Sequence, residues 1–410
     1  KKYVLKMRLK EIYLDNGATT KVDPKVVEKM NYYHLEKYGN SSSNHSFGQD
    51  AKEALEEARG VIAKSIGCRA EEIVFTSGGT ESNNLALKGL AFAQKVAGTG
   101  KNHLITTKIE HDCVLESCKW LEKQGFQITY LPVDKDGFVD PEKLRVAISD
   151  KTVLVSIIHG NNEIGTIQDL EKLGEVCQEK NVPFHTDACQ SYTKTEINVE
   201  KQHLSLVTLN AHKIHGPKGV GALYVKKGTK LTPWQHGGGH EFGIRSGTEN
   251  IPGVIGFVEA VKLASKKHVE TMAKLRDKLV NGVLQIEGSR LNGPGIDNSE
   301  NKRLCNNTNF SFERIEGEAL GGYLDQHWIC SSTGSACSSK SLEASHVLKA
   351  IGLSDEQAHG SLRLTLSRFN TEEEIDYALK MIPKYVEKLR KISPLGRIVQ
   401  AAKKLAGGGE

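Results

Sequence analysis

Two apolar runs of the sequence end in side chains that could do chemistry together. Residues 206–209 lead into Asn210, His212 and Lys213, after which glycine and proline interrupt any regular structure. Residues 182–186 form a second apolar run that leads into Asp187. A lysine at the end of a strand is most often solvated or paired, and that interpretation stays open for Lys213 taken alone. An acid at the end of a neighbouring strand favours a shared site instead.

An amine and a carboxylate placed in this way are what pyridoxal phosphate needs. The lysine binds the cofactor aldehyde as a Schiff base, and the acid keeps the pyridine nitrogen protonated. Residues 72–76 predict a strand, followed by a turn at Ser77, Gly79 and Thr80 and then a helix, a geometry that directs free backbone N–H groups at a phosphate. Such a turn is an ordinary strand–helix connection about as often, but beside Asp187 and Lys213 a phosphate site is favoured.

Other polar side chains follow predicted strands, and each has a structural alternative. His111 could cap the next helix or stack on an aromatic ligand. Asn161 and Asn162, shortly before Gly165, could form a turn or direct one amide at the cofactor. The glycine-rich residues 236–250 suit an oxyanion site or a subunit contact, and a flexible surface loop is the alternative.

One cysteine has the setting of a reactive thiol. Small polar residues dominate positions 328–341, which predicts a mobile loop with Cys337 near its tip. An exposed thiol among hydroxyl groups differs from the usual buried structural cysteine. Cys330, closer to an apolar pair, is interpreted as structural.

The elements that must position these residues alternate between strands and helices. Seven strands are expected, at residues 73–76, 103–106, 127–131, 152–157, 182–186, 204–209 and 219–225. This alternation predicts an α/β fold with a mostly parallel sheet that is covered on both faces and binds its ligand beyond the strand ends. After Pro252 long helical patterns dominate, so we place a domain boundary near residue 265 and expect a smaller α+β domain beyond it.

Composition excludes several classes of protein. The chain has 410 residues, of which 38% are hydrophobic and 26% charged, as in an ordinary soluble globular protein. We expect no membrane span, and a net charge of +5 without basic clusters gives no reason to expect direct nucleic-acid binding. The eight cysteines form no CxxC pair, which favours a reducing compartment and gives no reason to expect a zinc site.

Taken together, the motifs resemble a known family. They are Ala18-Thr19-Thr20, Ser77-Gly78-Gly79-Thr80-Glu81-Ser82-Asn83-Asn84, Asn161-Asn162-Glu163-Ile164-Gly165, His212-Lys213, Gly237-Gly238-Gly239, Arg245-Ser246-Gly247-Thr248 and Ser335-Ala336-Cys337. In this order they resemble a group I cysteine desulfurase of the NifS/IscS type, from about Tyr13 to Leu395. The resemblance implies a fold-type I pyridoxal-phosphate homodimer that takes sulfur from L-cysteine and releases L-alanine.

The resemblance also implies a role for each site residue. Lys213 would hold the cofactor and move the substrate's α-proton, Asp187 would pair with the ring nitrogen, and His111 would stack on the ring and assist proton transfer. The phenolic oxygen would be bound by Asn162 and Gln190. The phosphate would be held by Ser77, Gly79, Thr80, Asn210 and His212, and by Thr248 of the other subunit. Arg363, with Asn162, would bind the substrate, and Cys337 would carry the sulfur as a persulfide.

Three positions depart from the family pattern. Ser41 replaces the usual proline after Gly39-Asn40, which should loosen that loop. Asn210 stands where the family usually has a phosphate-binding serine, so the affinity for the cofactor is in question. Cys189, beside Gln190, is an unusual thiol near the ring, interpreted as a packing residue with a second nucleophile as the alternative.

The resemblance finally implies an organisation and partners. Residues 16–265 would form the large cofactor-binding domain, 1–15 and 266–395 a small domain carrying the cysteine loop at about 329–341, and 396–410 a tail. Sulfur would pass to an iron–sulfur scaffold protein or another acceptor, including carriers for tRNA thiolation. A selenocysteine lyase, a cysteine desulfhydrase and a non-catalytic platform for a scaffold protein are the alternatives. A cytoplasmic location is expected, and the mature form of an organellar protein would have the same sequence features.

Overall fold

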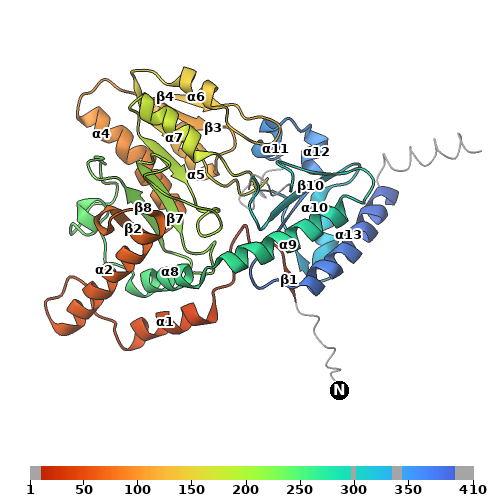
Figure 1. The fold of residues 1–410 in the computed structure, drawn as a ribbon, viewed down its shortest axis with the longest axis horizontal. Coiled ribbons are helices and arrows are strands. Elements are labelled where there is room, and N and C mark those ends of the chain that lie inside the picture. Colours follow the sequence, from red (N-terminus) through yellow and green to blue (C-terminus); the bar gives the residue numbers. More distant parts are fainter. Residues whose placement is uncertain (1–10, 297–301, 335–343, 393–410) are drawn as a thin grey trace, which may run out of the picture.

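The computed structural model describes residues 11–296, 302–334 and 344–392. Cys337, most of the predicted cysteine loop and the predicted tail at 396–410 lie outside the described residues. The larger part of the molecule surrounds one sheet, and α9, α10 and α13 lie together at the other end (Figure 1). Within the described ranges, no helix is both long and apolar enough to cross a membrane.

A seven-stranded sheet with the order β2-β8-β7-β6-β5-β3-β4 forms the centre of the larger part (Figure 1). Its strands are β2 (Ile73–Thr76), β3 (His103–Thr107), β4 (Gln127–Leu131), β5 (Thr152–Ser156), β6 (Phe184–Asp187), β7 (Leu206–Asn210) and β8 (Gly221–Val225). β8 runs antiparallel to its neighbours β2 and β7, and the other pairs are parallel. The predicted mostly parallel sheet of seven strands is therefore confirmed.

Buried side chains on alternate residues cover both faces of this sheet, as the uninterrupted apolar strands predict. Phe75 and Val207 belong to one core cluster, together with side chains from helices such as Leu55 and Leu173. Val74 and Leu206 belong to a second cluster, together with side chains from other helices such as Leu90 and Leu121. Because the two clusters hold the strands from both sides, the strand ends form a fixed edge on which a site can be built.

The helices of this part connect the strands. They are α1 (Pro24–Leu35), α2 (Ser46–Ile66), η1 (Ala70–Glu72), α3 (Gly79–Asn84), η2 (Leu85–Gly89), α4 (Leu90–Val96), α5 (Asp112–Lys123), α6 (Pro141–Ala147), α7 (Leu170–Glu179), η3 (Glu241–Gly243) and α8 (Ile251–Leu263). Local signals set several starts: Asp23 caps α1, with Pro24 in its first turn, and Asp140 and Pro141 do the same for α6.

The smaller part is built on an antiparallel sheet with the order β12-β10-β9. The strands and helices of this part are β9 (Ser289–Leu291), β10 (Asn307–Phe312), β11 (Ile329–Cys330), β12 (Ser361–Thr365), α9 (Lys266–Val283), α10 (Gly317–Asp325), α11 (His346–Ala350), α12 (Asp355–His359) and α13 (Glu372–Ile392). From the start of the chain, β1 (Ile12–Tyr13) pairs in parallel with β11. Ile12 and Leu14 are buried in the same core cluster as Leu364 and Ile382.

Candidate active site

A cavity of about 270 Å³ lies at the carboxyl ends of the sheet strands, where ligands of open α/β sheets bind. Its lining residues are Gly17, Ala18, Gly79, Thr80, Asn83, His111, Cys113, Ile158, Asn162, Asp187, Cys189, Gln190, Asn210, His212, Lys213 and Arg363. Ten of the residues predicted for the site are thus brought together. Ser77 and Thr248 do not line this cavity, and Cys337 lies outside the described residues.

Lys213 reaches this cavity from the turn after β7. Its Nζ donates hydrogen bonds to the carbonyl oxygens of Gly17 and, at 2.7 Å, Ala18. Burial lowers the pKa of Lys213 to about 8, and the positive charge of Arg363 acts in the same direction. Two carbonyl groups therefore hold the amine, which has no ion-pair partner among the described residues, and about a tenth of it is uncharged at pH 7, far more than for a solvated lysine.

Asp187 lies on the same cavity at the end of β6 and is only 5% exposed. Its Oδ1 accepts a hydrogen bond from the backbone N–H of Cys189 at 2.9 Å, and its Oδ2 accepts one from the Asn83 amide at 2.6 Å. Because each carboxylate oxygen has two lone pairs, Asp187 can still accept a further hydrogen bond from a ligand. The predicted amine and carboxylate face one shared cavity.

The turn between β2 and α3 has the close packing expected of a phosphate site. A Cβ atom at Gly79 would lie 2.6 Å from Sγ of Cys189, so this position accepts only glycine without rearrangement. Asn210, 3% exposed, also lines the cavity, and its Oδ1 has no hydrogen-bond partner among the described residues. Burial lowers the pKa of His212 to about 3, so its ring is neutral. Ser77 is exposed, and its backbone N–H donates to Glu81 at 2.7 Å.

His111 caps the next helix, which is one of the two alternatives that the sequence left open, and it also lines the cavity. It is the N-cap of α5, where its Nδ1 accepts a hydrogen bond from the backbone N–H of Cys113 at 3.2 Å. Nδ1 is also 3.1 Å from Sγ of Cys113. An Nδ1 that accepts the backbone N–H leaves the ring proton on Nε2, so a neutral His111 can donate from that nitrogen.

The two neighbouring asparagines, Asn161 and Asn162, make different contacts. Asn161 shapes the turn, since its Oδ1 accepts the backbone N–H groups of Glu163 and Ile164, both at 2.9 Å. Asn162 lines the cavity, as the functional interpretation required of one amide. Gln190 donates one hydrogen of its Nε2 to the Gly17 carbonyl at 2.8 Å, which leaves the second hydrogen for a ligand.

Arg363 comes from β12 in the smaller part and is 2% exposed. It donates to Asp15 at 2.9 Å and to the carbonyl of Asn162 at 3.2 Å, and its Nε has no partner among the described residues. A guanidinium group has five N–H donors, so Arg363 keeps donors for a ligand carboxylate while its position is fixed by Asp15.

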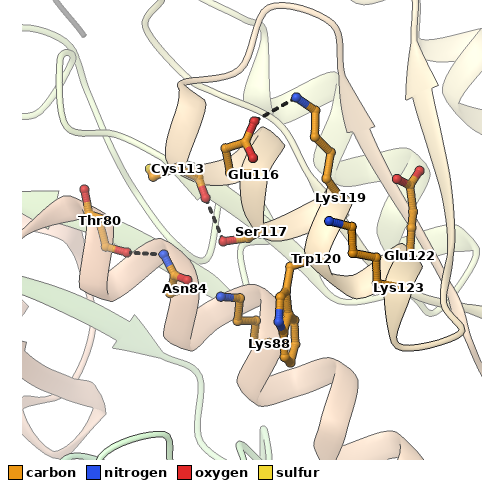
Figure 2. Close-up of a pocket in the computed structure, with 10 residues that line it drawn as sticks. All are labelled: Thr80, Asn84, Lys88, Cys113, Glu116, Ser117, Lys119, Trp120, Glu122 and Lys123. Carbon is orange, nitrogen blue, oxygen red and sulfur yellow. Dashed lines mark hydrogen bonds and ion pairs between the residues drawn. The ribbon is translucent and has the colours of Figure 1, made fainter.

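A second, wider cavity of about 830 Å³ adjoins the first one (Figure 2). Thr80 and Cys113 line both cavities. Figure 2 shows Lys88 next to Trp120, with its Nζ 4.7 Å from the ring centre, and Glu116 paired with Lys119 at 2.7 Å. Among the described residues, the cavity of about 270 Å³ therefore adjoins an open space between α3 and α5.

Asn83 and Cys113 are polar lining residues that were not predicted as site residues from the sequence. Asn83 is four positions after Gly79, so it lies on the same face of the helical segment, and this spacing was a usable signal. Cys113 lies in the cavity because His111 caps α5, which directs the first turn of that helix inward. Asp15 accepts a hydrogen bond from Arg363, which lies far away in the sequence, so no local pattern could predict this contact.

These residues fit pyridoxal phosphate. The cavity offers an amine with a lowered pKa, a buried carboxylate with spare acceptor capacity, and a close-packed glycine turn next to the unpartnered Asn210. This is the donor and acceptor set that a cofactor with an aldehyde, a ring nitrogen and a phosphate requires.

The chain is similar to known proteins over most of its length. Residues 12–378 match the family model of aminotransferase class-V. The cysteine desulfurase IscS of Dictyoglomus turgidum is 49% identical, over 94% of this chain and 97% of that protein, and the one of Methanosarcina thermophila is 49% identical, over 94% of both chains. A solved NifS-like protein superposes with a TM-score of 0.85 at 39% identity and covers 92% of this chain and 100% of its own.

A further solved structure, described as SspA in complex with cysteine, superposes with a TM-score of 0.77 at 37% identity, over 88% of this chain and 100% of that one. The match over nearly the whole chain leads to one assignment. The chain belongs to the class-V aminotransferase family, in its cysteine desulfurase branch.

Proposed function

We propose that this protein is a pyridoxal-phosphate-dependent cysteine desulfurase. The observation that carries the proposal is that Lys213 and Asp187 line one cavity of cofactor size. When bound, pyridoxal phosphate supplies an aldehyde that condenses with amines and a ring that withdraws electrons from the α-carbon of an amino acid.

The chain's own residues would prepare this chemistry. Lys213, with its pKa lowered to about 8, supplies an amine that can be uncharged when the aldehyde arrives and can later carry a proton at Nζ. Asp187 would accept a hydrogen bond from the ring nitrogen of the bound cofactor, and His111 would have its Nε2 hydrogen available to donate. The turn at Gly79 and Thr80, with Asn210 and His212, holds the phosphate.

Substrate cysteine would be held by its carboxylate on Arg363, a group that suits planar two-point recognition. Cys337 as thiolate then attacks the substrate sulfur. The carbon–sulfur bond breaks, a sulfur–sulfur bond forms on Cys337, and the carbon skeleton takes up a proton to leave as alanine. Cysteine and the Cys337 thiol thus become alanine and a persulfide, with no added oxidant.

The active unit would be a homodimer. Thr248 is exposed and does not line the cavity of its own chain, which supports its proposed role at the phosphate of the other subunit. The opening beside Thr80 offers a path for that approach. We propose an iron–sulfur scaffold protein, or another thiol carrier such as one for tRNA thiolation, as the sulfur acceptor.

The test is an assay of the purified protein with L-cysteine that follows alanine and protein-bound persulfide together. We expect equal amounts of both before any acceptor is added, and no persulfide from Cys337→Ser. Pyruvate, ammonia and free sulfide from Cys337→Ser, with no alanine, would instead identify a desulfhydrase, because elimination of sulfide needs neither the thiol nor a reductant. A strong preference for selenocysteine over cysteine would identify a lyase for that substrate, and no turnover at all would contradict catalysis.

A further inference from the structure

The Asn83 side chain lies between two residues of the active site, although the desulfurase chemistry described above does not use it. Asn83 is fully buried and lies in α3, one helical turn after the glycine of the phosphate turn. Its Nδ2 donates a hydrogen bond to Oδ2 of Asp187 at 2.6 Å and another to Sγ of Cys113 at 3.1 Å. Both hydrogens of the amide are therefore used.

The orientation of this amide follows from its neighbours. If the amide were turned over, its oxygen would face the Asp187 carboxylate, and two acceptors would oppose each other without a proton. In the orientation found, the amide donates to a carboxylate at short distance, which is the stronger, charge-assisted kind of hydrogen bond.

This arrangement leaves one polar atom unsatisfied. Oδ1 of Asn83 is buried and has no partner among the described residues. An unsatisfied buried acceptor is destabilising, so an amide here stabilises the fold poorly compared with an apolar side chain of the same shape. The amide therefore contributes through the two hydrogen bonds that it donates, and the stronger of the two is accepted by Asp187.

We propose that Asn83 is a positioning residue that acts through Asp187: its hydrogen bond holds the carboxylate in place and favours its charged form, so that the proton shared with the cofactor stays on the ring nitrogen. This inference rests on the proposed cofactor. A carboxylate that already accepts a strong hydrogen bond holds its negative charge more readily and takes the shared proton less readily. Without the Asn83 donor, the proton would move toward Asp187 and the ring would withdraw electrons less strongly.

The experiment measures where that proton lies. The holoenzyme is prepared with pyridoxal phosphate labelled with ¹⁵N in the ring, and the ring nitrogen resonance is recorded by solid-state NMR at neutral pH. Asn83→Leu removes the donor at similar volume, and Asn83→Ala does so without added branching if the leucine variant folds poorly. Asn292→Leu is the control, because it also removes a fully buried amide, one that bonds Asn309 and Ser311 away from the cavity.

We expect the wild type and Asn292→Leu to show a protonated ring nitrogen. Both Asn83 variants should shift the resonance toward the unprotonated value, corresponding to a roughly tenfold change in the protonation equilibrium, as expected from losing one hydrogen bond to a charged group. A resonance at the wild-type position in a loaded Asn83 variant would overturn the inference alone. Failure of the wild type to bind the labelled cofactor would overturn the proposed function instead.

Discussion

Lys213 is the residue whose surroundings say most about the chemistry. Carbonyl oxygens are its hydrogen-bond acceptors, and burial and Arg363 lower its pKa from the ordinary 10.5 to about 8. An ammonium group in this setting loses its proton more readily than a surface lysine does. The site is therefore ready to bind an aldehyde at a pH at which a solvated lysine would be almost fully charged.

This predicts how cofactor uptake depends on pH. The uncharged amine is the nucleophile, so the rate at which the apoprotein takes up pyridoxal phosphate should rise with pH through about 8 and level off above it. Arg363→Gln removes a positive charge near Nζ and should move the midpoint upward, whereas Arg145→Gln on the surface should not. Stopped-flow absorbance measures this rate, and a midpoint near 10.5 in the wild type would show that Lys213 behaves as an ordinary lysine.

Cys189 is the second residue with a testable role. Burial and the charge of Asp187 raise its pKa well above the ordinary value, so it is a poor nucleophile, and its Sγ fills the space in front of Gly79. Gly79→Ala should therefore overpack this turn at a cost of about 1–3 kcal/mol, with weaker cofactor binding.

Removing the sulfur should relieve that clash. We expect the double variant Gly79→Ala, Cys189→Ala to regain most of the stability and cofactor affinity lost in Gly79→Ala. Thermal unfolding and cofactor titration of the four proteins in this cycle measure the coupling. Strictly additive effects would contradict the packing role of Cys189.

At the same scale, the sequence predicted the residues at strand ends and missed those held by distant contacts. Lys213, Asp187, His111 and Asn162 follow buried strands, so the parallel sheet brings them to one edge. Asp15 was not predicted, because its contact with Arg363 joins residues 348 positions apart. Ser77 was predicted to bind the phosphate, but it does not line the cavity. It is exposed, and its backbone N–H donates to the Glu81 side chain.

Among the elements, the glycine-rich segment 236–250 is more firmly attached than its composition suggests. Glu241 in η3 accepts hydrogen bonds from Arg59 of α2 at 2.7 and 3.0 Å and from the backbone N–H of Phe75 in β2 at 2.7 Å. Arg245 pairs with Glu81 beside the phosphate turn at 2.8 Å. The segment is thus anchored to the sheet at one point and to the start of α3 at another.

The buried ion pair gives a prediction at this scale. Arg59 and Glu241 are both nearly inaccessible to solvent, so Arg59→Met should leave an uncompensated buried carboxylate and reduce the free energy of unfolding by about 3–5 kcal/mol. Glu116→Ala breaks an exposed pair with Lys119 and should cost no more than about 1 kcal/mol. Chemical denaturation compares the two, and equal effects would contradict an anchoring role for Glu241.

Helices and strands could be predicted where their burial requires apolar residues. They could not be predicted where only pairing with another strand defines them. All seven strands of the main sheet were expected because continuous apolar runs mark strands covered on both faces. β9 (Ser289–Leu291) was missed, since it is short, partly polar and lies on the edge of its sheet. β1 pairs in parallel with β11, which lies far along the chain, and no local pattern in the sequence predicts this pairing.

On the scale of the whole molecule, the site is incomplete within one chain if Thr248 acts on the other subunit. Mixing subunits tests this. A Lys213→Ala chain and a Thr248→Val chain each form deficient homodimers, but their hybrid would contain one intact site. Random mixing should therefore restore about a quarter of wild-type activity. No gain after mixing, with hybrids shown by native mass spectrometry, would place Thr248 in the site of its own chain.

The division of the chain is also a proposal at this scale. We propose that residues 16–265 form the cofactor-binding domain and that 1–15 join 266–395, because Ile12 and Leu14 share a core with β12 and α13. Cys337 would belong to the second domain, so that Arg363 and the thiol come from one domain and Lys213 and Asp187 from the other.

The most direct measurement asks which residue carries the cofactor. The protein loaded with pyridoxal phosphate is reduced with borohydride, digested, and mapped by mass spectrometry. If the account is right, the reduced cofactor is attached to the peptide that contains Lys213, and Lys213→Ala shows no labelled peptide in its place. A label on another lysine in the wild type, or on none, would contradict the central claim.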